Sequence, residues 1–156
     1  MVVIYSCRMT GVEVVSDAFP IQENEGEPYF SVQTSEFTDT NEYSDTAGQK
    51  VIDVVKTFDY CETSYTKKTY VGYFKLYLKG LLAWFKENKP DEVAQFQKDA
   101  GVFMKFFLSQ KKDDLGFWMT EANSSEGYVP WGYWKPNSAD PPVFVYFKHA
   151  FNVKKA

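Results

Sequence analysis

Residues 64–109 carry large apolar side chains at helical spacing, in two runs separated by Pro90. Steps of three and four residues place side chains on one face of an α-helix. The first run is Tyr70, Phe74, Tyr77, Leu78, Leu81 and Phe85, and the second is Val93, Phe96, Ala100, Phe103 and Phe107. Ser64 and Thr66 are suitable N-cap residues for the first helix, and Pro90 suits the first turn of the second. The sequence therefore predicts an α-helical hairpin.

Runs of β-branched and aromatic residues, which favour strands, lie on both sides of this hairpin. They are residues 2–7, 12–15, 29–32, the start of 51–60, 115–121, 128–134 and 143–147, with a hairpin loop expected at 123–127. The 156 residues contain no linker and are enough for one domain with a substantial core. The sequence predicts a single α+β domain, residues 1–156, with a mainly antiparallel sheet and one projecting helical hairpin.

Residues 34–49 consist mostly of Ser, Thr, Asp, Glu and Asn and predict a mobile acidic loop. The segment from Asp39 to Asp45 has a faint similarity to an EF-hand calcium loop. However, Tyr43 stands where an oxygen ligand is needed, Ser44 where the turn needs Gly, and Lys50 where a bidentate Glu belongs. We interpret the segment as a solvated loop and assign no metal ligands.

Charge is unevenly distributed along the chain. Residues 1–63 hold 3 Lys or Arg against 12 Asp or Glu, a balance of −9, whereas residues 64–109 hold 8 Lys against 4 acids, a balance of +4. The hairpin lysines are Lys67, Lys68, Lys75, Lys79, Lys86, Lys89, Lys98 and Lys105. They form either a solvated helix face or a docking surface for an acidic partner. A net charge of −4 does not favour a nucleic-acid partner.

The two cysteines, Cys7 and Cys61, cannot build a disulfide framework, so we expect free thiols in a reducing compartment. The apolar start of the chain lacks the basic segment of a signal peptide, and no apolar run approaches the roughly 20 residues of a membrane helix. We expect a cytoplasmic protein without a membrane partner.

No nucleotide-binding or catalytic motif is present: neither GxGxxG nor GxxxxGK occurs. The single histidine, His149, is interpreted as a surface residue, and two Cys plus one His are too few for a structural zinc site. We therefore expect no enzyme activity and no required cofactor. Aromatic residues make up 19% of the chain. They indicate either a core of large rings or a small-ligand-binding β domain that uses Trp118, Tyr128, Trp131 and Trp134.

Four groups of residues, taken in their order along the chain, match the pattern of a known family. They are Val3-Ile4-Tyr5 with Glu13 and Ser16-Asp17, Glu62-Thr63-Ser64-Tyr65-Thr66-Lys67, Phe117-Trp118-Met119-Thr120-Glu121 with Glu126-Gly127-Tyr128-Val129, and Val145-Tyr146-Phe147-Lys148. They resemble the N-terminus, the start of the helical hairpin, the C-terminal signature and the last strand of the translationally controlled tumour protein (TCTP) family. Thr120-Glu121 stands where that signature usually has Gly-Glu, and the acidic loop looks shortened, which indicates a divergent member.

The resemblance implies a β-sheet core with a projecting α-hairpin, similar to that of a Rab-GTPase-binding chaperone. It also implies calcium binding, association with tubulin and microtubules, contact with a Ras-like small GTPase and other proteins, and support of growth and survival. By matching position, Glu13 and Glu121 would face the GTPase, and the lysine-bearing hairpin would contact tubulin. Calcium affinity is expected to be weak, because no preformed cage of oxygen ligands is visible. The chain ends in Ala156 rather than the cysteine of many animal members, so we expect a monomer.

Overall fold

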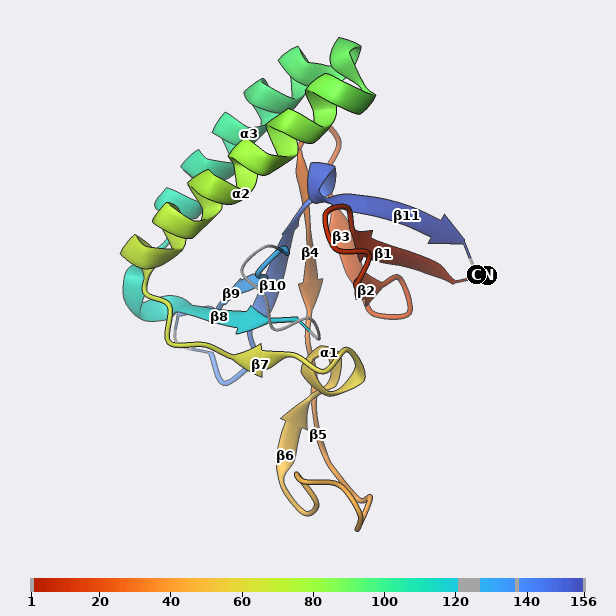
Figure 1. Ribbon diagram of the computed structural model, residues 1–156. Coiled ribbons are helices and arrows are strands. Elements are labelled where there is room, and N and C mark those ends of the chain that lie inside the picture. The colour runs from red at the N-terminus through yellow and green to blue at the C-terminus, as the bar shows by residue number, and fades with distance from the viewer. Residues whose placement is uncertain (1, 121–126, 137, 156) are drawn as a thin grey trace.

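The computed structural model describes residues 2–120, 127–136 and 138–155 and shows an antiparallel sheet covered on one side by a long helical hairpin (Figure 1). Every strand pair in these residues is antiparallel. The strands are β1 (Val3–Cys7), β2 (Glu13–Ser16), β3 (Ile21–Glu23), β4 (Tyr29–Gln33), β5 (Glu36–Thr38), β6 (Lys50–Ile52), β7 (Cys61–Glu62), β8 (Leu115–Met119), β9 (Trp131–Tyr133), β10 (Val143–Phe147) and β11 (Phe151–Lys155). The helices are α1 (Asp53–Thr57), α2 (Lys67–Asn88) and α3 (Val93–Leu108), with short 3-10 turns at Pro90–Glu92, Lys112–Asp114 and Lys148–Ala150.

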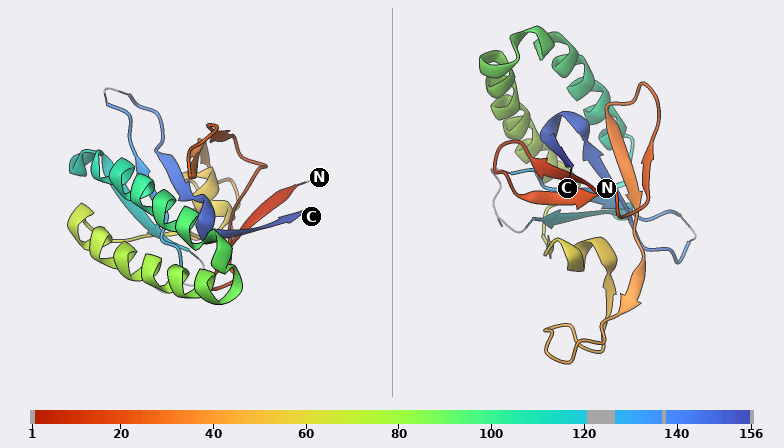
Figure 2. Two further views of the ribbon diagram at one scale, coloured as in Figure 1. Left: turned by 90° about the horizontal axis from the view of Figure 1, so that it is seen from above. Right: turned by 90° about the vertical axis from the view of Figure 1, so that its right-hand side faces the viewer.

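The strands form three groups. The largest has the order β3-β4-β10-β9-β8-β7, a second has the order β11-β1-β2, and β5 and β6 pair alone. Every residue of β10 is buried, since this strand is flanked on both edges and covered by the hairpin. The β5–β6 pair projects from the body at the end opposite the hairpin, and the two termini lie side by side (Figure 2).

The hairpin begins and turns where the sequence predicts. The Thr66 hydroxyl accepts the Thr69 amide while the Thr69 hydroxyl accepts the Thr66 amide, which makes a reciprocal capping box. Pro90 opens the 3-10 turn that leads into α3. All the predicted apolar residues face inward except for Leu78 and Val93, which are half-buried, and Tyr73 joins the buried face. The prediction of a helical hairpin is confirmed.

Rings of the hairpin pack directly on rings of the sheet. Ring centroids lie 5.0 Å apart for Phe103 and Phe147, 5.0 Å apart for Phe107 and Trp131, and 4.8 Å apart for Tyr70 and Phe117. Burial of each such ring stabilises the fold by about 1.5–3 kcal/mol. The abundance of aromatic residues is therefore explained by a core of large rings.

Buried tyrosine hydroxyls hold residues 127–130. The sequence predicts a strand over residues 128–134, but β9 begins only at Trp131. Tyr70 donates to the Val129 carbonyl over 2.6 Å, and Tyr73 accepts the Val129 amide over 2.9 Å. Tyr128 donates to the Val145 carbonyl of β10 over 3.0 Å. Burial raises the pKa of all three phenols well above the usual value, so they stay protonated and remain donors. Side chains thus replace the ladder bonds that this segment lacks.

Two local predictions are wrong, and one strand is not predicted. The buried strand expected at the start of residues 51–60 stops at Ile52 and continues as α1, with Val54 fully buried. The strand that the sequence does not predict is β11, which pairs with β1 from Phe151 to Lys155. Residues 34–49 are not entirely loop, because they contain β5, which pairs with β6 directly after the segment. The mobility of the segment stays a prediction. The loop expected at 123–127 lies mostly outside the described residues.

Candidate protein-interaction surfaces

The outward face of the hairpin carries a row of exposed lysines. Lys68, Lys75, Lys79 and Lys86 of α2 follow one another in steps of seven, four and seven residues, which keeps them within about 40° of arc on a helix. Lys98 and Lys105 of α3 are also exposed and, seven residues apart, lie on one side of their helix. Within the described parts of the chain, none of these six forms an ion pair. We call these six residues the lysine face.

The other two hairpin lysines have structural roles. Lys67 donates to the Leu108 carbonyl over 2.8 Å and to the Gln110 carbonyl, so its ammonium caps the C-terminal end of α3. A cation at this end also interacts favourably with the helix dipole. Lys89 lies 3.7 Å from Glu92, across the turn between the helices. The sequence groups these two with the partner-facing lysines. The bonds of Lys67 join parts of the chain about 40 residues apart and leave no local signal, whereas the Lys89–Glu92 pair is local.

Glu13 is the first residue of β2 and is exposed. It pairs with Ser6 beside an irregularity in the β1–β2 ladder. This irregularity lets both Val14 and Val15 be buried while Glu13 faces solvent. Glu121, the second residue assigned by resemblance to a GTPase-facing surface, lies outside the described residues.

A groove runs along the flank of α2, between this helix, the turn after β1 and the segment before α2. Its volume is about 620 Å³. It is lined by Met9, Tyr65, Thr69, Tyr73, Leu76, Tyr77 and Gly80. Leu76 is 72% exposed although it is a large apolar residue in the middle of a helix. The sequence analysis missed this groove; the one signal for it was a leucine outside the buried helical stripe.

Comparisons with known proteins assign the family. A sequence profile described as translationally controlled tumour protein matches residues 1–152. The chain belongs to the TCTP family. The translationally-controlled tumor protein homolog 1 of Dictyostelium discoideum is 37% identical over 155 residues, which cover 87% of this chain and 88% of that protein. The homolog of Yarrowia lipolytica is 30% identical over 139 residues, which cover 89% of this chain and 81% of that protein.

Solved TCTP structures share the fold. The tumor-associated protein p23fyp of Schizosaccharomyces pombe matches with a TM-score of 0.79 at 24% identity and covers 99% of both chains. The TCTP of Caenorhabditis elegans matches with a TM-score of 0.68 at 17% identity and covers 99% of this chain and 98% of its own. The predicted α+β fold is confirmed. In the residues described for this family member, no helix is long and apolar enough to cross a membrane.

The aromatic cluster considered as a ligand site in this TCTP-family chain is a part of the core. Tyr128 and Trp131 are fully buried and Trp118 is 3% exposed, with its ring 4.6 Å from that of Phe144. Trp134 alone reaches the surface, and its ring packs 5.9 Å from Trp118. None of the four side chains lines the groove beside α2 or the two smaller pockets of about 310 and 190 Å³. The interpretation as a small-ligand-binding β domain is therefore wrong.

His149 is half-buried rather than a fully exposed surface residue. Its side chain is 18% exposed, and its Nε2 lies 2.7 Å from Asp99 of α3. The rings of Phe85 and Phe96 stand edge-on to it, each at 5.7 Å. Arg8 donates to the His149 carbonyl over 3.0 Å, with its guanidinium 4.5 Å from the Trp84 ring. His149 thus connects the part of the hairpin near the α2–α3 turn to the segment between β10 and β11.

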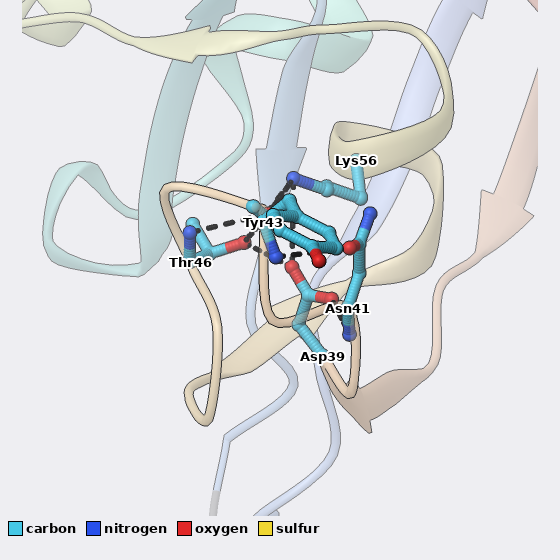
Figure 3. Close-up of polar contacts among 6 residues, drawn as sticks. Asp39, Asn41, Tyr43, Thr46 and Lys56 are labelled. Carbon is cyan, nitrogen blue, oxygen red and sulfur yellow. Dashed lines mark hydrogen bonds and ion pairs between the residues drawn. The ribbon is translucent and has the colours of Figure 1, made fainter.

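Asp39 organises the loop between β5 and β6 (Figure 3). Asp39 is 5% exposed, and its carboxylate accepts the Asn41 amide over 3.0 Å and the Thr46 hydroxyl over 2.5 Å. The Lys56 ammonium lies 3.5 Å from the same carboxylate and donates to Ser44 over 2.7 Å. The interpretation of this segment as a solvated loop is wrong at Asp39.

The Asp39 cluster does not fit calcium. Its oxygens surround the ammonium group of Lys56, so a cation of the protein itself already lies where a metal ion would bind. In the described ranges, no group of three or more His, Cys, Asp or Glu side chains is arranged to hold a metal ion.

The pKa of Asp39 provides a test of this cluster. The hydroxyls of Ser44 and Thr46, and then the Asn41 amide, hold the pKa of this carboxyl well below its usual range. Because the folded pKa lies below the unfolded value of about 3.9, the stabilising effect is complete above roughly pH 4 and is lost as the pH falls toward the folded pKa. We expect a carbon-13 NMR titration to show Asp39 still ionised near pH 3. Thr46→Val should raise this pKa, and an ordinary pKa in the unchanged protein would contradict the described hydrogen bonds.

Proposed function

We propose that this TCTP-family chain is a non-enzymatic, cytoplasmic protein that binds several protein partners and supports growth and survival. The proposed partners are tubulin or microtubules and a Ras-like small GTPase. The observation that carries the proposal is the lysine face, six exposed lysines on the outer side of the hairpin in a chain of net charge −4. The family membership supports the choice of partners.

The lysine face suits a large acidic surface such as that of tubulin. Its side chains stand on two helices that are fixed by their packing on the sheet, so the spacing of the charges is set before a partner arrives. In the described chain no carboxylate pairs with them, so a partner has no internal ion pair to break. Charges arranged in this way speed association and make it sensitive to salt.

Reversal of charge on the lysine face tests this function. Lys75→Glu combined with Lys79→Glu should weaken binding to microtubules about tenfold at low salt, because two favourable contacts become repulsive. Co-sedimentation with taxol-stabilised microtubules measures the effect. Lys154→Glu with Lys155→Glu is the matched control, since these exposed lysines lie on β11. Equal loss in both pairs, or no loss in the first, would refute a specific role for the hairpin.

We propose that Glu13 belongs to the surface that contacts a Ras-like GTPase. In the unbound chain it is exposed and, among the described residues, forms no ion pair, so its carboxylate is available to a partner. Glu13→Lys should reduce the amount of GTPase retained in a pull-down several-fold and leave the thermal midpoint within about 2 °C. Glu36→Lys, at the exposed first residue of β5, provides the control. Unchanged retention by the Glu13 variant would remove this residue from the interface.

We propose that the chain needs no cofactor and that its calcium affinity is weak. What supports this is that the oxygens of the Asp39 cluster are already engaged by Lys56. Without a preformed cage, the Kd should lie in the range of about 10⁻⁴–10⁻³ M or above. Titration calorimetry with calcium chloride measures this constant, and a Kd near 1 µM or below would show that a calcium site does exist.

A further inference from the structure

The groove on α2 lies directly beside the lysine face. On an α-helix, residues three or four positions apart are surface neighbours. Leu76 of the groove therefore lies next to Lys79, three positions further along the helix. The apolar floor and the row of charges form one continuous strip, apolar on one side and basic on the other.

The apolar side of this strip is unusually open. Leu76 is 72% exposed and Met9, on the opposite wall, is 40% exposed. The Tyr73 hydroxyl is already bonded to the Val129 amide and the Gly127 carbonyl. The groove therefore offers apolar surface rather than unpaired polar groups, and a partner gains by covering it.

Two glycines leave room for a close approach. A Cβ built at Gly72 meets nothing within 4 Å, and one built at Gly80 meets only the end of Met9 at 3.5 Å. Glycine within a helix is less favourable than alanine, and the packing of this chain does not require it at either position. Both glycines lie on the same flank of α2 as Leu76, four residues to either side.

We propose that this groove binds an amphipathic helix of a partner protein, with the apolar face of that helix on Leu76 and Met9 and an acidic flank along Lys68, Lys75, Lys79 and Lys86. The proposal rests on the proposed function, that the lysine face binds acidic partners, and adds the form in which one of them binds. The charge of the strip selects an acidic partner over a basic or neutral one.

The length of the groove fits a helix. From Thr69 to Gly80 the lining spans about 17 Å of helix axis, or three turns. A partner helix of that length presents apolar anchors at positions i, i+4 and i+7, the pattern of recognition in helix-binding grooves. Acidic residues on the neighbouring side of the partner helix then lie over the α2 lysines of the lysine face.

The probe is a fluorescein-labelled peptide of about 15 residues with Leu at i, i+4 and i+7 and Glu along one flank, and its anisotropy is measured with the full chain. Leu76→Asp should weaken binding at least tenfold, as should Lys75→Glu with Lys79→Glu. Gly72→Leu should also weaken it at least tenfold, because the new side chain fills the open strip. Amide NMR shifts on titration should concentrate at Thr69, Tyr73 and Gly80.

Matched controls lie away from the groove. Val102→Asp changes an exposed apolar residue of α3, and Gly101→Leu changes a glycine of α3 that is equally open. Lys154→Glu with Lys155→Glu reverses two exposed lysines of β11, outside the lysine face. These variants should bind the peptide within twofold of the unchanged chain. Equal losses in both sets would mean diffuse charge attraction and would overturn the proposal.

Three further results would overturn the groove as a helix site. The first is equal binding of a peptide that carries a central proline, which cannot form the helix. The second is self-association in sedimentation velocity that Leu76→Asp abolishes, which would make a second copy of the chain the occupant. The third is binding to phosphatidylserine vesicles that the same variant abolishes, which would make a membrane the occupant. If the Leu76 variant keeps the peptide while the lysine pair loses microtubules, the groove proposal fails and the proposed function stands.

Discussion

Buried tyrosines fix the position of the hairpin on the sheet. Residues 127–129 have no strand of their own, and their backbone groups are bonded by Tyr70 and Tyr73 from α2 and linked by Tyr128 to β10. Each phenol stays protonated because burial raises its pKa. A buried backbone group without a partner costs about 1–3 kcal/mol. These bonds therefore resist any movement of α2 away from the sheet.

A helix held in this way presents its outer surface as a rigid platform. The inner face is filled by rings, and the outer face keeps charges that no described residue neutralises. The bond from Lys67 to the end of α3 and the contact of His149 with Asp99 fasten the hairpin near both of its ends. Partners thus meet charges and apolar surface whose geometry does not have to be created on binding, which lowers the entropic cost of association.

The projecting β5–β6 pair is stabilised in a different way. It buries few apolar groups, and its loop depends on the cluster of Asp39, Thr46 and Lys56. Such a cluster orders an acidic segment through hydrogen bonds and charge instead of hydrophobic contacts. The proposal of weak calcium affinity rests on the same contacts, because Lys56 already engages the oxygens of the cluster. The acidic β5–β6 pair and the basic hairpin lie at opposite ends of the molecule (Figure 1). The electrostatic field of each is therefore presented to partners separately.

The sequence by itself determined the hairpin, the exposed lysines of its outer face and the α+β class, because helical and strand periodicity are local and report which side of an element is buried. Only the tertiary structure decided the pairing of β11 with β1, the contact of His149 with Asp99 and the bond of Lys67 to the end of α3. Each of these depends on residues far apart in the chain. The groove beside Leu76 has the same origin, since one of its walls comes from the turn after β1 and the other from α2. Periodicity describes one element at a time, whereas a groove between two elements exists only once both are packed.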